Sequence, residues 1–299
     1  MIVVVGSINL DLVARVPRHP RPGETLAGTS FVSSPGGKGA NQALAARRAG
    51  ADVALFGAVG SDAFAEPALA LLRADGVDLA GVRTLAAPTG VALIQVDDAG
   101  ENTIVVIAGA NGVVAADWVA DAVLTPRAIV AMPLEIPLAA VAAVAVRARV
   151  RGARVILNAA PAMAVPAETL ASVDILVVNE HEAATVAAPL GISAEPAAFS
   201  TAIHARFGAA AVVTLGARGA VAADGMGRFE FSAPEVRLVD TVGAGDALIG
   251  ALAAALDRGA PLREALREGI AAGSLACTRE GAQPSLPWRP DIARLAATI

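Results

Sequence analysis

Two glycine-rich turns carry the side chains best suited to chemistry. One of them reads Asp-Thr-Val-Gly-Ala-Gly-Asp and precedes an apolar run over residues 248–256 that is long enough for a helix. Backbone N–H groups in the first turn of a helix are free and lie at the positive end of its dipole, so Gly243, Ala244 and Gly245 predict an anion site suited to phosphate. Asp246 follows directly, where its carboxylate could accept a proton from a hydroxyl group that attacks the phosphate. The alternative is that Asp246 only caps its helix.

The second turn reads Pro-Gly-Gly-Lys-Gly-Ala-Asn-Gln and contains Lys38, the only lysine among the 23 basic residues, followed by Asn41. Asn9 and Asp11 come just after the first apolar strand, and Glu135 follows a later one. Amide, carboxylate and ammonium groups are the donors and acceptors that a polyhydroxyl substrate requires. These residues therefore predict a site for a polyhydroxyl substrate, although turns and helix caps explain the others equally well when taken alone, and Glu135 could be a solvated charge.

A third candidate pair lies at the end of another predicted strand. Asn179 and Glu182 are three residues apart, which places them on one face of the helix that follows. They could hold a hydrated Mg²⁺ ion, which prefers one or two protein oxygen ligands together with water and substrate phosphates. The alternative is an N-cap with an acidic first turn, which needs no metal.

Composition limits the class of protein that could use these residues. The 299 residues are 55% hydrophobic and 17% charged, which excludes a disordered chain, and arginine interrupts the apolar runs before they reach the length of a membrane span. The net charge of −5 comes without a basic block, so neither nucleic acid nor an anionic membrane is an expected partner. A single cysteine and an N-terminus that reads as a strand predict a cytoplasmic protein with a small polar substrate.

The elements that must position these residues alternate between two kinds. Short apolar, β-branched runs predict strands at 53–56, 128–131, 154–157, 175–178 and 211–215. Alanine-rich stretches between them predict helices at 41–49, 63–74, 137–150, 180–188 and 196–207. This alternation predicts an α/β fold in which helices cover both faces of a mostly parallel sheet and ligands bind at the carboxyl ends of the strands.

Two segments depart from the alternation. Residues 12–16 with 25–32, and 89–96 with 102–108, have the pattern of hairpin strands. They predict a small separate sheet that could close over the strand ends and whose exposed surface could pair two subunits. Ordinary edge strands of the main sheet are the alternative. The whole chain, 1–299, is expected to form one domain, with the lid contributed by about 12–34 and 89–108.

The two glycine-rich turns together are similar to the two signatures of the ribokinase (PfkB-type) carbohydrate kinases, and they occur in the same order. The similarity extends along essentially the whole chain, through Gly-Ser-Ile-Asn-Leu-Asp at 6–11, Ala-Gly-Ala-Asn at 108–111, Leu-Asn-Ala-Ala-Pro-Ala at 157–162 and Gly-Ala-Gln-Pro-Ser at 281–285. The resemblance implies a ribokinase-like three-layer sandwich with a β-sheet lid. It also implies transfer of a phosphoryl group from ATP to the 5-hydroxyl of D-ribose, with Asp246 as the base.

The resemblance assigns further residues to the substrates. Those implied to bind the sugar are Asn9, Asp11, Gly37, Lys38, Asn41 and Glu135, with Asp246 at the reacting hydroxyl. Those implied to bind ATP are Asn179, Thr214, Leu215, Gly216, Ala217, Arg218, Gly219, Gly245 and Asp246, with Ile270 on the adenine side. Relatives often carry His or Asn where this chain has Ile270, so a polar contact to the nucleotide base is in doubt.

The resemblance also implies a monovalent cation, usually K⁺, beside the anion-binding turn. The matching positions are Asp240, Val242, Ala276, Arg279, Gly281 and Ser285. It further implies Mg²⁺ with ATP and a homodimer formed through the lid. Two other readings stay open from the sequence: a kinase of the same family that acts on deoxyribose, another sugar or a nucleoside, and a non-catalytic regulator that binds sugar or nucleotide.

Overall fold

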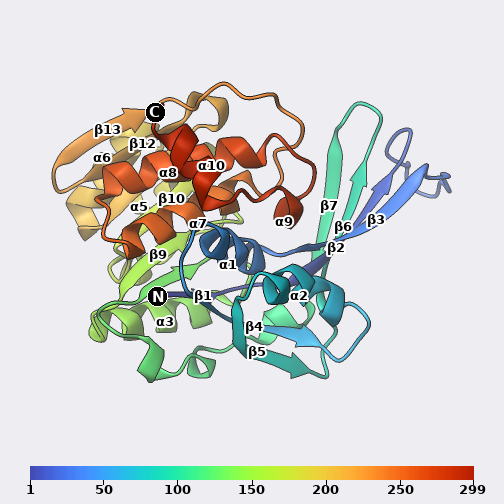
Figure 1. The fold of residues 1–299 in the computed structure, drawn as a ribbon, viewed down its shortest axis with the longest axis horizontal. Coiled ribbons are helices and arrows are strands. Elements are labelled where there is room, and N and C mark those ends of the chain that lie inside the picture. The colour runs from blue at the N-terminus through green and yellow to red at the C-terminus, as the bar shows by residue number, and fades with distance from the viewer.

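The computed structural model describes residues 1–299, and its centre is a nine-stranded sheet (Figure 1). The strand order is β13-β12-β11-β10-β9-β8-β1-β4-β5, and every neighbouring pair is parallel except the two that involve β12. The strands are β1 (Ile2–Val5), β4 (Val53–Gly60), β5 (Asp78–Leu85), β8 (Ile129–Met132), β9 (Arg154–Asn158), β10 (Ile175–Asn179), β11 (Ala210–Thr214), β12 (Ala220–Asp224) and β13 (Gly227–Phe231).

Alternate side chains of each central strand enter different cores, because successive residues of a strand point to opposite faces of the sheet. In β1, Ile2 and Val4 belong to one buried cluster, and Val3 and Val5 belong to the other. Strands that are buried on both faces need apolar residues at every position, which is why they read as continuous apolar runs in the sequence.

Helices cover both faces and complete a three-layer α/β sandwich, as the sequence predicts. The helices that pack in the first cluster are α1 (Lys38–Arg48), α2 (Ala65–Ala74), α7 (Ala244–Asp257), α8 (Leu262–Ala276) and α10 (Arg289–Ala296). Those that pack in the second are α3 (Leu138–Val150), α4 (Ala167–Leu170), α5 (Glu180–Leu190) and α6 (Pro196–Phe207). A short helix, α9 (Ala282–Ser285), joins α8 to α10. No helix is long and apolar enough to cross a lipid bilayer.

The strand order reverses at β1, and this reversal fixes where a ligand can bind. The chain runs from β1 outward through β4 to β5 on one side, and then returns to β8 on the other side of β1. Connections on opposite faces leave a crevice beyond the carboxyl ends of the two strands at such a switch point. The segments that follow β1 and β8 contain the predicted sugar-site residues Asn9, Asp11 and Glu135.

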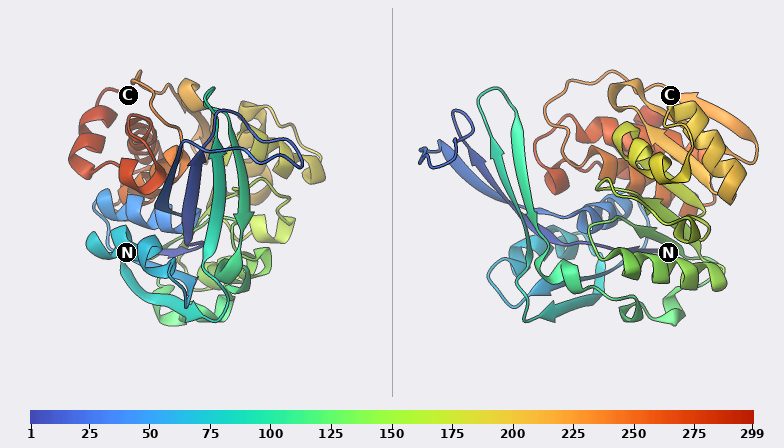
Figure 2. Two further views of the ribbon diagram at one scale, coloured as in Figure 1. Left: turned by 90° about the vertical axis from the view of Figure 1, so that its right-hand side faces the viewer. Right: turned by 180° about the vertical axis from the view of Figure 1, so that it is seen from behind.

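The second sheet is the predicted lid, and it projects away from the body of the molecule (Figure 2). Its order is β3-β2-β6-β7, with β2 (Asn9–Arg15), β3 (Ser30–Gly36), β6 (Gly90–Val96) and β7 (Asn102–Ile107). The two hairpins are antiparallel, and β2 pairs with β6 in parallel, so they form one sheet. The prediction of a strand from residue 25 is wrong, because β3 begins at Ser30, opposite Arg15. The preceding loop contains Pro22 and Gly23, which disfavour a strand.

Candidate active site

Glu135 connects the segment after β8 to the segment after β1 at the switch point. Its Oε2 accepts a hydrogen bond of 2.6 Å from the Ser7 hydroxyl and one of 3.0 Å from the backbone N–H of Lys38. Ser7 in turn accepts a bond of 3.2 Å from the N–H of Gly39 in the first turn of α1. A single carboxylate therefore fixes the first strand, the start of α1 and its own loop relative to one another.

The residues predicted to bind sugar hydroxyls lie around this junction. Asn9 is buried, and its Oδ1 accepts a bond of 2.7 Å from Asn111, whose own Oδ1 accepts one of 2.9 Å from the N–H of Ile8. Asp11 lies two residues further along β2, and burial raises its pKa from 3.8 to about 7, with smaller contributions from the charges of Glu135 and Asp246. Asp11 is thus close enough to both carboxylates to respond to their charge, as one cluster requires.

Lys38 balances this group of carboxylates. The negative charge of Asp246 raises the pKa of the Lys38 ammonium in opposition to burial, and Glu135, Glu182 and Asp11 act in the same direction. The lysine charge in turn lowers the pKa of Asp11. The only lysine in the chain is therefore the cation shared by four acidic side chains that come from four separate segments of the chain.

Asp246 is held by side chains of a different helix. It is 6% exposed, and its Oδ2 accepts a bond of 2.9 Å from Asn41 and its Oδ1 one of 3.0 Å from Gln42, both on α1. The N-cap of α7 is Gly243, at a φ of 78° that disfavours any side chain, and no side chain caps this helix. Asp246 is thus not the cap of α7, which was the structural alternative for it.

The first turn of α7 offers free donors beside this carboxylate. The backbone N–H groups of Gly245 and Asp246 have no acceptor in the protein, and the N–H of Ala244 makes only a long bond of 3.3 Å to Thr241. Such groups at the positive end of a fourteen-residue helix suit an oxyanion. A proton acceptor and an anion-binding turn therefore lie side by side, as a phosphoryl transfer requires.

A cavity of about 550 Å³ opens onto this turn from the side of α8. Among the residues predicted to bind ATP, those that line it are Thr214, Gly216, Ala217, Gly219, Gly245 and Ile270. Four others do not line it: Leu215, Asp246, Arg218, which pairs with Glu180 at 2.6 Å, and Asn179, whose side chain caps α5. The cavity has the size and the largely apolar wall of a site for a nucleotide base and ribose.

The sequence and the structure can now be compared with known proteins. The profile of the pfkB family carbohydrate kinases matches residues 1–289. The chain belongs to this family. It is 36% identical over 296 residues to a ribokinase of Haemophilus influenzae, a match that covers 97% of this chain and 96% of that protein.

Two solved structures of the same family are similar throughout. A ribokinase of Thermotoga maritima superposes with a TM-score of 0.91 at 30% identity and covers 99% of both chains. A ribokinase of Arabidopsis thaliana, solved in complex with ribose and ATP, gives a TM-score of 0.89 at 32% identity and covers 99% of this chain and 98% of that one. The main sheet and the lid of this pfkB-family chain are thus a fold shared with sugar kinases.

The positions predicted to hold a monovalent cation gather on two adjacent segments of the chain. Asp240 accepts bonds from the N–H of Val242 at 3.0 Å and from the N–H of Gly281 at 2.8 Å. The carbonyl of Cys277 accepts one of 2.8 Å from Val239, which joins the same segments, and Ser285 is buried in α9. A carboxylate and carbonyl groups are the hard oxygen donors that fit an alkali-metal ion, so the residues present suit the predicted K⁺.

Asn179 and Glu182 form a reciprocal capping box at the start of α5. The amide oxygen of Asn179 accepts from the N–H of Glu182, and the carboxylate of Glu182 accepts from the N–H of Asn179, both at 2.8 Å. The cap that the sequence left as an alternative is therefore present. Burial raises the pKa of Glu182, and its charge acts on Lys38, so its carboxylate also faces the site. Binding of a hydrated Mg²⁺ here stays a prediction.

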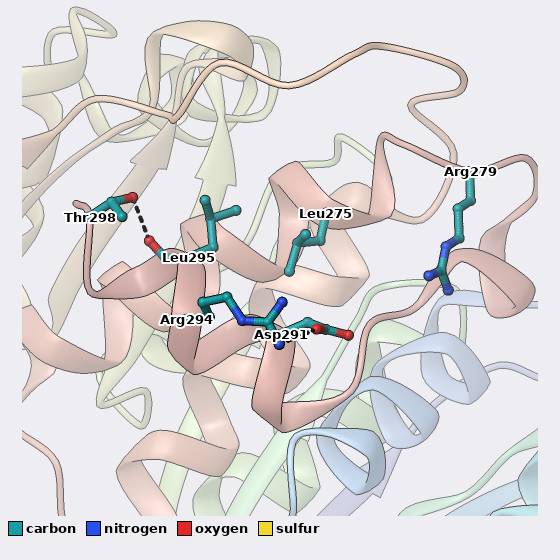
Figure 3. A pocket seen from close by; sticks show the side chains of 6 residues that line it. All are labelled: Leu275, Arg279, Asp291, Arg294, Leu295 and Thr298. Atoms are coloured by element: carbon teal, nitrogen blue, oxygen red, sulfur yellow. Dashed lines mark hydrogen bonds and ion pairs between the residues drawn. The ribbon is translucent and has the colours of Figure 1, made fainter.

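A second cavity, of about 470 Å³, shares no lining residue with the first (Figure 3). It lies between α8 and α10, where Arg294 pairs with Asp291 at 3.2 Å and the hydroxyl of Thr298 bonds to the carbonyl of Leu295 at 2.7 Å. Arg279, one of the positions predicted for the cation, also lines this cavity. Arg294 and Thr298 make their bonds within the cavity wall, and apart from Arg279 no lining residue belongs to a predicted site.

Sequence reasoning missed four polar residues at the site. Ser7, Gln42, Asn111 and Asn158 are all buried, and each contacts a residue that was predicted or another member of this set. All four lie in segments that carry the family resemblance, which was the available signal. A buried glutamine or asparagine among alanines and glycines has to find a hydrogen-bond partner, and here the partners are site residues.

Proposed function

We propose that this chain is an ATP-dependent kinase that phosphorylates the 5-hydroxyl of D-ribose, giving D-ribose 5-phosphate and ADP. The observation that carries the proposal is the position of Asp246. This carboxylate is buried between the free N–H groups of α7 and a set of sugar-type donors and acceptors, Asn9, Asp11 and Lys38 among them. The similarity to ribokinases over nearly the whole chain, one of them solved with ribose and ATP, supports ribose as the acceptor.

The reaction follows from the arrangement. Asp246 accepts the proton of the 5-hydroxyl as the hydroxyl oxygen forms a bond to the γ-phosphorus, and the bond from that phosphorus to the bridging oxygen of ADP breaks. The N–H groups of Gly245 and Asp246 donate to the oxygens of the group in transfer, and Lys38 offsets their charge. The cavity beside Ile270 and Gly219 holds the base and ribose of ATP.

Two metal ions complete the proposal. A hydrated Mg²⁺ near Asn179 and Glu182 would neutralise phosphate charge, and a K⁺ at the Asp240 loop would keep the anion-binding turn in shape. Asp240 already ties the start of that turn to Gly281, so an ion bound there acts on the turn without touching the sugar. We expect the cation to change kcat more than the KM for ribose.

We also propose that two chains pair through their lids. Strand register puts Val32, Ile104 and Val106 on the same face of the lid as Asp11, and these three are 59%, 49% and 53% exposed. Phe31, Leu93 and Val105 are exposed on the opposite face, so the lid carries apolar surface of the kind that marks an interaction site on both of its sides. A second lid laid across the Asp11 face would cover Val32, Ile104 and Val106 and would also shield the sugar from water.

The test is ADP release by the purified protein with ATP, Mg²⁺ and a panel of ribose, 2-deoxyribose, fructose and adenosine, with K⁺ exchanged for Na⁺. The highest kcat/KM on ribose supports the proposal, because a site built to bond a hydroxyl rejects the analogue that lacks it. A preference for another acceptor keeps Asp246 as the base and reassigns the sugar shell. No turnover with any acceptor favours a non-catalytic binding protein.

A further inference from the structure

We infer that Gln42 and Asn158 position the catalytic base and thereby set the rate of phosphoryl transfer. The inference rests on the proposed function, because it concerns how Asp246 is held during that reaction. Neither residue belongs to the sugar-binding or nucleotide-binding set. Both are buried, at 1% and 7% exposure, and both lie within one short run of hydrogen bonds that ends on Asp246.

The run begins at the base. The amide nitrogen of Gln42 donates a bond of 3.0 Å to Oδ1 of Asp246 and a bond of 3.1 Å to Oδ1 of Asn158. A primary amide carries two N–H groups, so both are used and the amide plane is fixed by two acceptors. Asn41 donates to the other oxygen of Asp246 at 2.9 Å, which leaves the carboxylate little freedom to turn.

The other end of the run fixes its direction. Asn158 ends β9, and its amide nitrogen donates a bond of 3.3 Å to the carbonyl of Val177 in the adjacent strand β10. A backbone carbonyl only accepts, so the Asn158 oxygen must point the other way, toward Gln42. The Gln42 amide must then present its nitrogen, and not its oxygen, to the base. The backbone of the central sheet thus dictates which atom of Gln42 faces Asp246.

Helix packing makes this arrangement stiff. Asp246 and Gly250 are four residues apart on one face of α7, and Gln42 and Ala46 are four apart on α1. A Cβ built on Gly250 would lie 2.4 Å from the Cβ of Ala45 and 2.6 Å from the backbone nitrogen of Ala46, so the two helices are in backbone contact there. Gln42 and Asn41 lie one turn from this contact on α1, and Asp246 lies one turn from it on α7. The contact therefore keeps the two amides next to the Asp246 carboxylate.

Gln42 and Asn41 have different tasks despite their similar bonds. The amide oxygens of both residues are buried without a donor in the protein, but Asn41 belongs to the set predicted to bind the sugar and donates a single bond, to Asp246. Gln42 is joined to Asn158 instead, and both of its hydrogens are committed within the protein. Loss of Gln42 should therefore lower kcat and leave the KM for ribose nearly unchanged.

The first test combines Gln42→Leu, Asn158→Ala and the double variant. A displacement of about 1 Å at a reacting group can cost about 100-fold in rate, so we expect kcat to fall by about that factor in Gln42→Leu, with the ribose KM within about threefold of the wild type. Because the two residues act through one run of bonds, the double variant should be no slower than Gln42→Leu. If the fold-loss of kcat in the double variant equals the product of the losses in the two single variants, the two residues act independently and the inference is overturned.

The second test has a readout that a structural role would not change. Gln42→Glu keeps the shape of the side chain and places a carboxylate against Asp246, and two carboxylates in contact hold one proton between them. We expect the acidic limb of the pH profile of kcat to move upward by more than about one pH unit. The other titratable groups that act on Asp246 or Lys38 here, namely Asp11, Glu135 and Glu182, are the same in both proteins.

Leu44→Val is the matched control, because it trims a fully buried side chain of the same helix outside the run of bonds. It should lower the melting temperature and leave kcat and its pH profile in place. An active wild type whose Gln42→Leu and Gln42→Glu variants keep kcat and pH profile would overturn this inference alone. A wild type that is silent with every sugar would overturn the proposed function, and the inference with it.

Discussion

Replacing Asp11 with asparagine should stabilise the protein, and the gain should depend on pH. We propose that Asp11 binds the sugar, yet burial and the charges of Glu135 and Asp246 raise its pKa from 3.8 to about 7. Ionising this side chain in the folded protein is therefore harder than ionising it in the unfolded chain. Asparagine keeps the size and one of the two side-chain oxygens but has no charge to desolvate.

The sign and the magnitude follow from proton linkage. Between pH 4 and pH 7 the folded state retains the Asp11 proton that the unfolded state has lost, so this residue lowers the free energy of unfolding as the pH rises. The shift from 3.8 to about 7 corresponds to about 4 kcal/mol at the upper end of that window, at about 1.4 kcal/mol per pH unit. Below pH 4 the side chain is protonated in both states and the difference vanishes.

Urea unfolding of the wild type and of Asp11→Asn at unit steps from pH 5 to pH 9 measures this difference. We expect the stability advantage of the variant to grow by about 2.3 kcal/mol between pH 5 and pH 7 and to level off above about pH 8. Asp98→Asn, a change at the exposed turn between β6 and β7, controls for the loss of one negative charge. If the difference in free energy of unfolding between the variant and the wild type stays constant across this pH range, the surroundings do not raise the pKa of Asp11.

Three further changes test other parts of the site. Asp246→Asn should lower kcat by about 10²- to 10⁴-fold while calorimetric binding of ribose and ATP persists, because only the proton acceptor is removed; unchanged turnover would remove the base assignment. Gly250→Ala forces α1 and α7 apart, and we expect it to cost about 1 to 3 kcal/mol in chemical unfolding and to lower kcat as well. Asp240→Asn should abolish any difference between K⁺ and Na⁺ in kcat, whereas a retained difference would place the cation elsewhere.

Much of the fold could be predicted from the sequence because local patterns determine it. The apolar run 175–178 and the stretch 180–188 correspond to β10 and α5, each within two residues. The same logic failed at the start of β3, since that boundary is set by pairing with β2 across the lid and not by the residues at 25–29. Strands β12 and β13 and helix α8 were not predicted from the pattern at all.

The site shows the same division between local and distant information. The Asn179–Glu182 capping box involves residues only three positions apart, so the local sequence could predict it. The bonds from Gln42 to Asn158 and to Asp246 span 116 and 204 residues, and nothing near residue 42 indicates them. The way α1 packs across α7 decides which buried amide contacts which carboxylate. That packing is established only when the layers of the fold assemble, so local sequence does not show it.

The attachment of the lid has a mechanical consequence. Only Gly6, Ser7 and Ile8 separate β1 of the main sheet from β2 of the lid, and β3 ends at Gly36, paired with Asn9, just before α1 begins. The root of the lid is therefore the sugar shell itself, clamped by Glu135 through Ser7 and Lys38. A change in the angle of the lid must swing Asn9 and Asp11 about this clamp as a short lever. In the proposed kinase, sugar binding and closure of the lid would thus be one movement, and a stiffer joint at residues 6–8 would slow both capture and release.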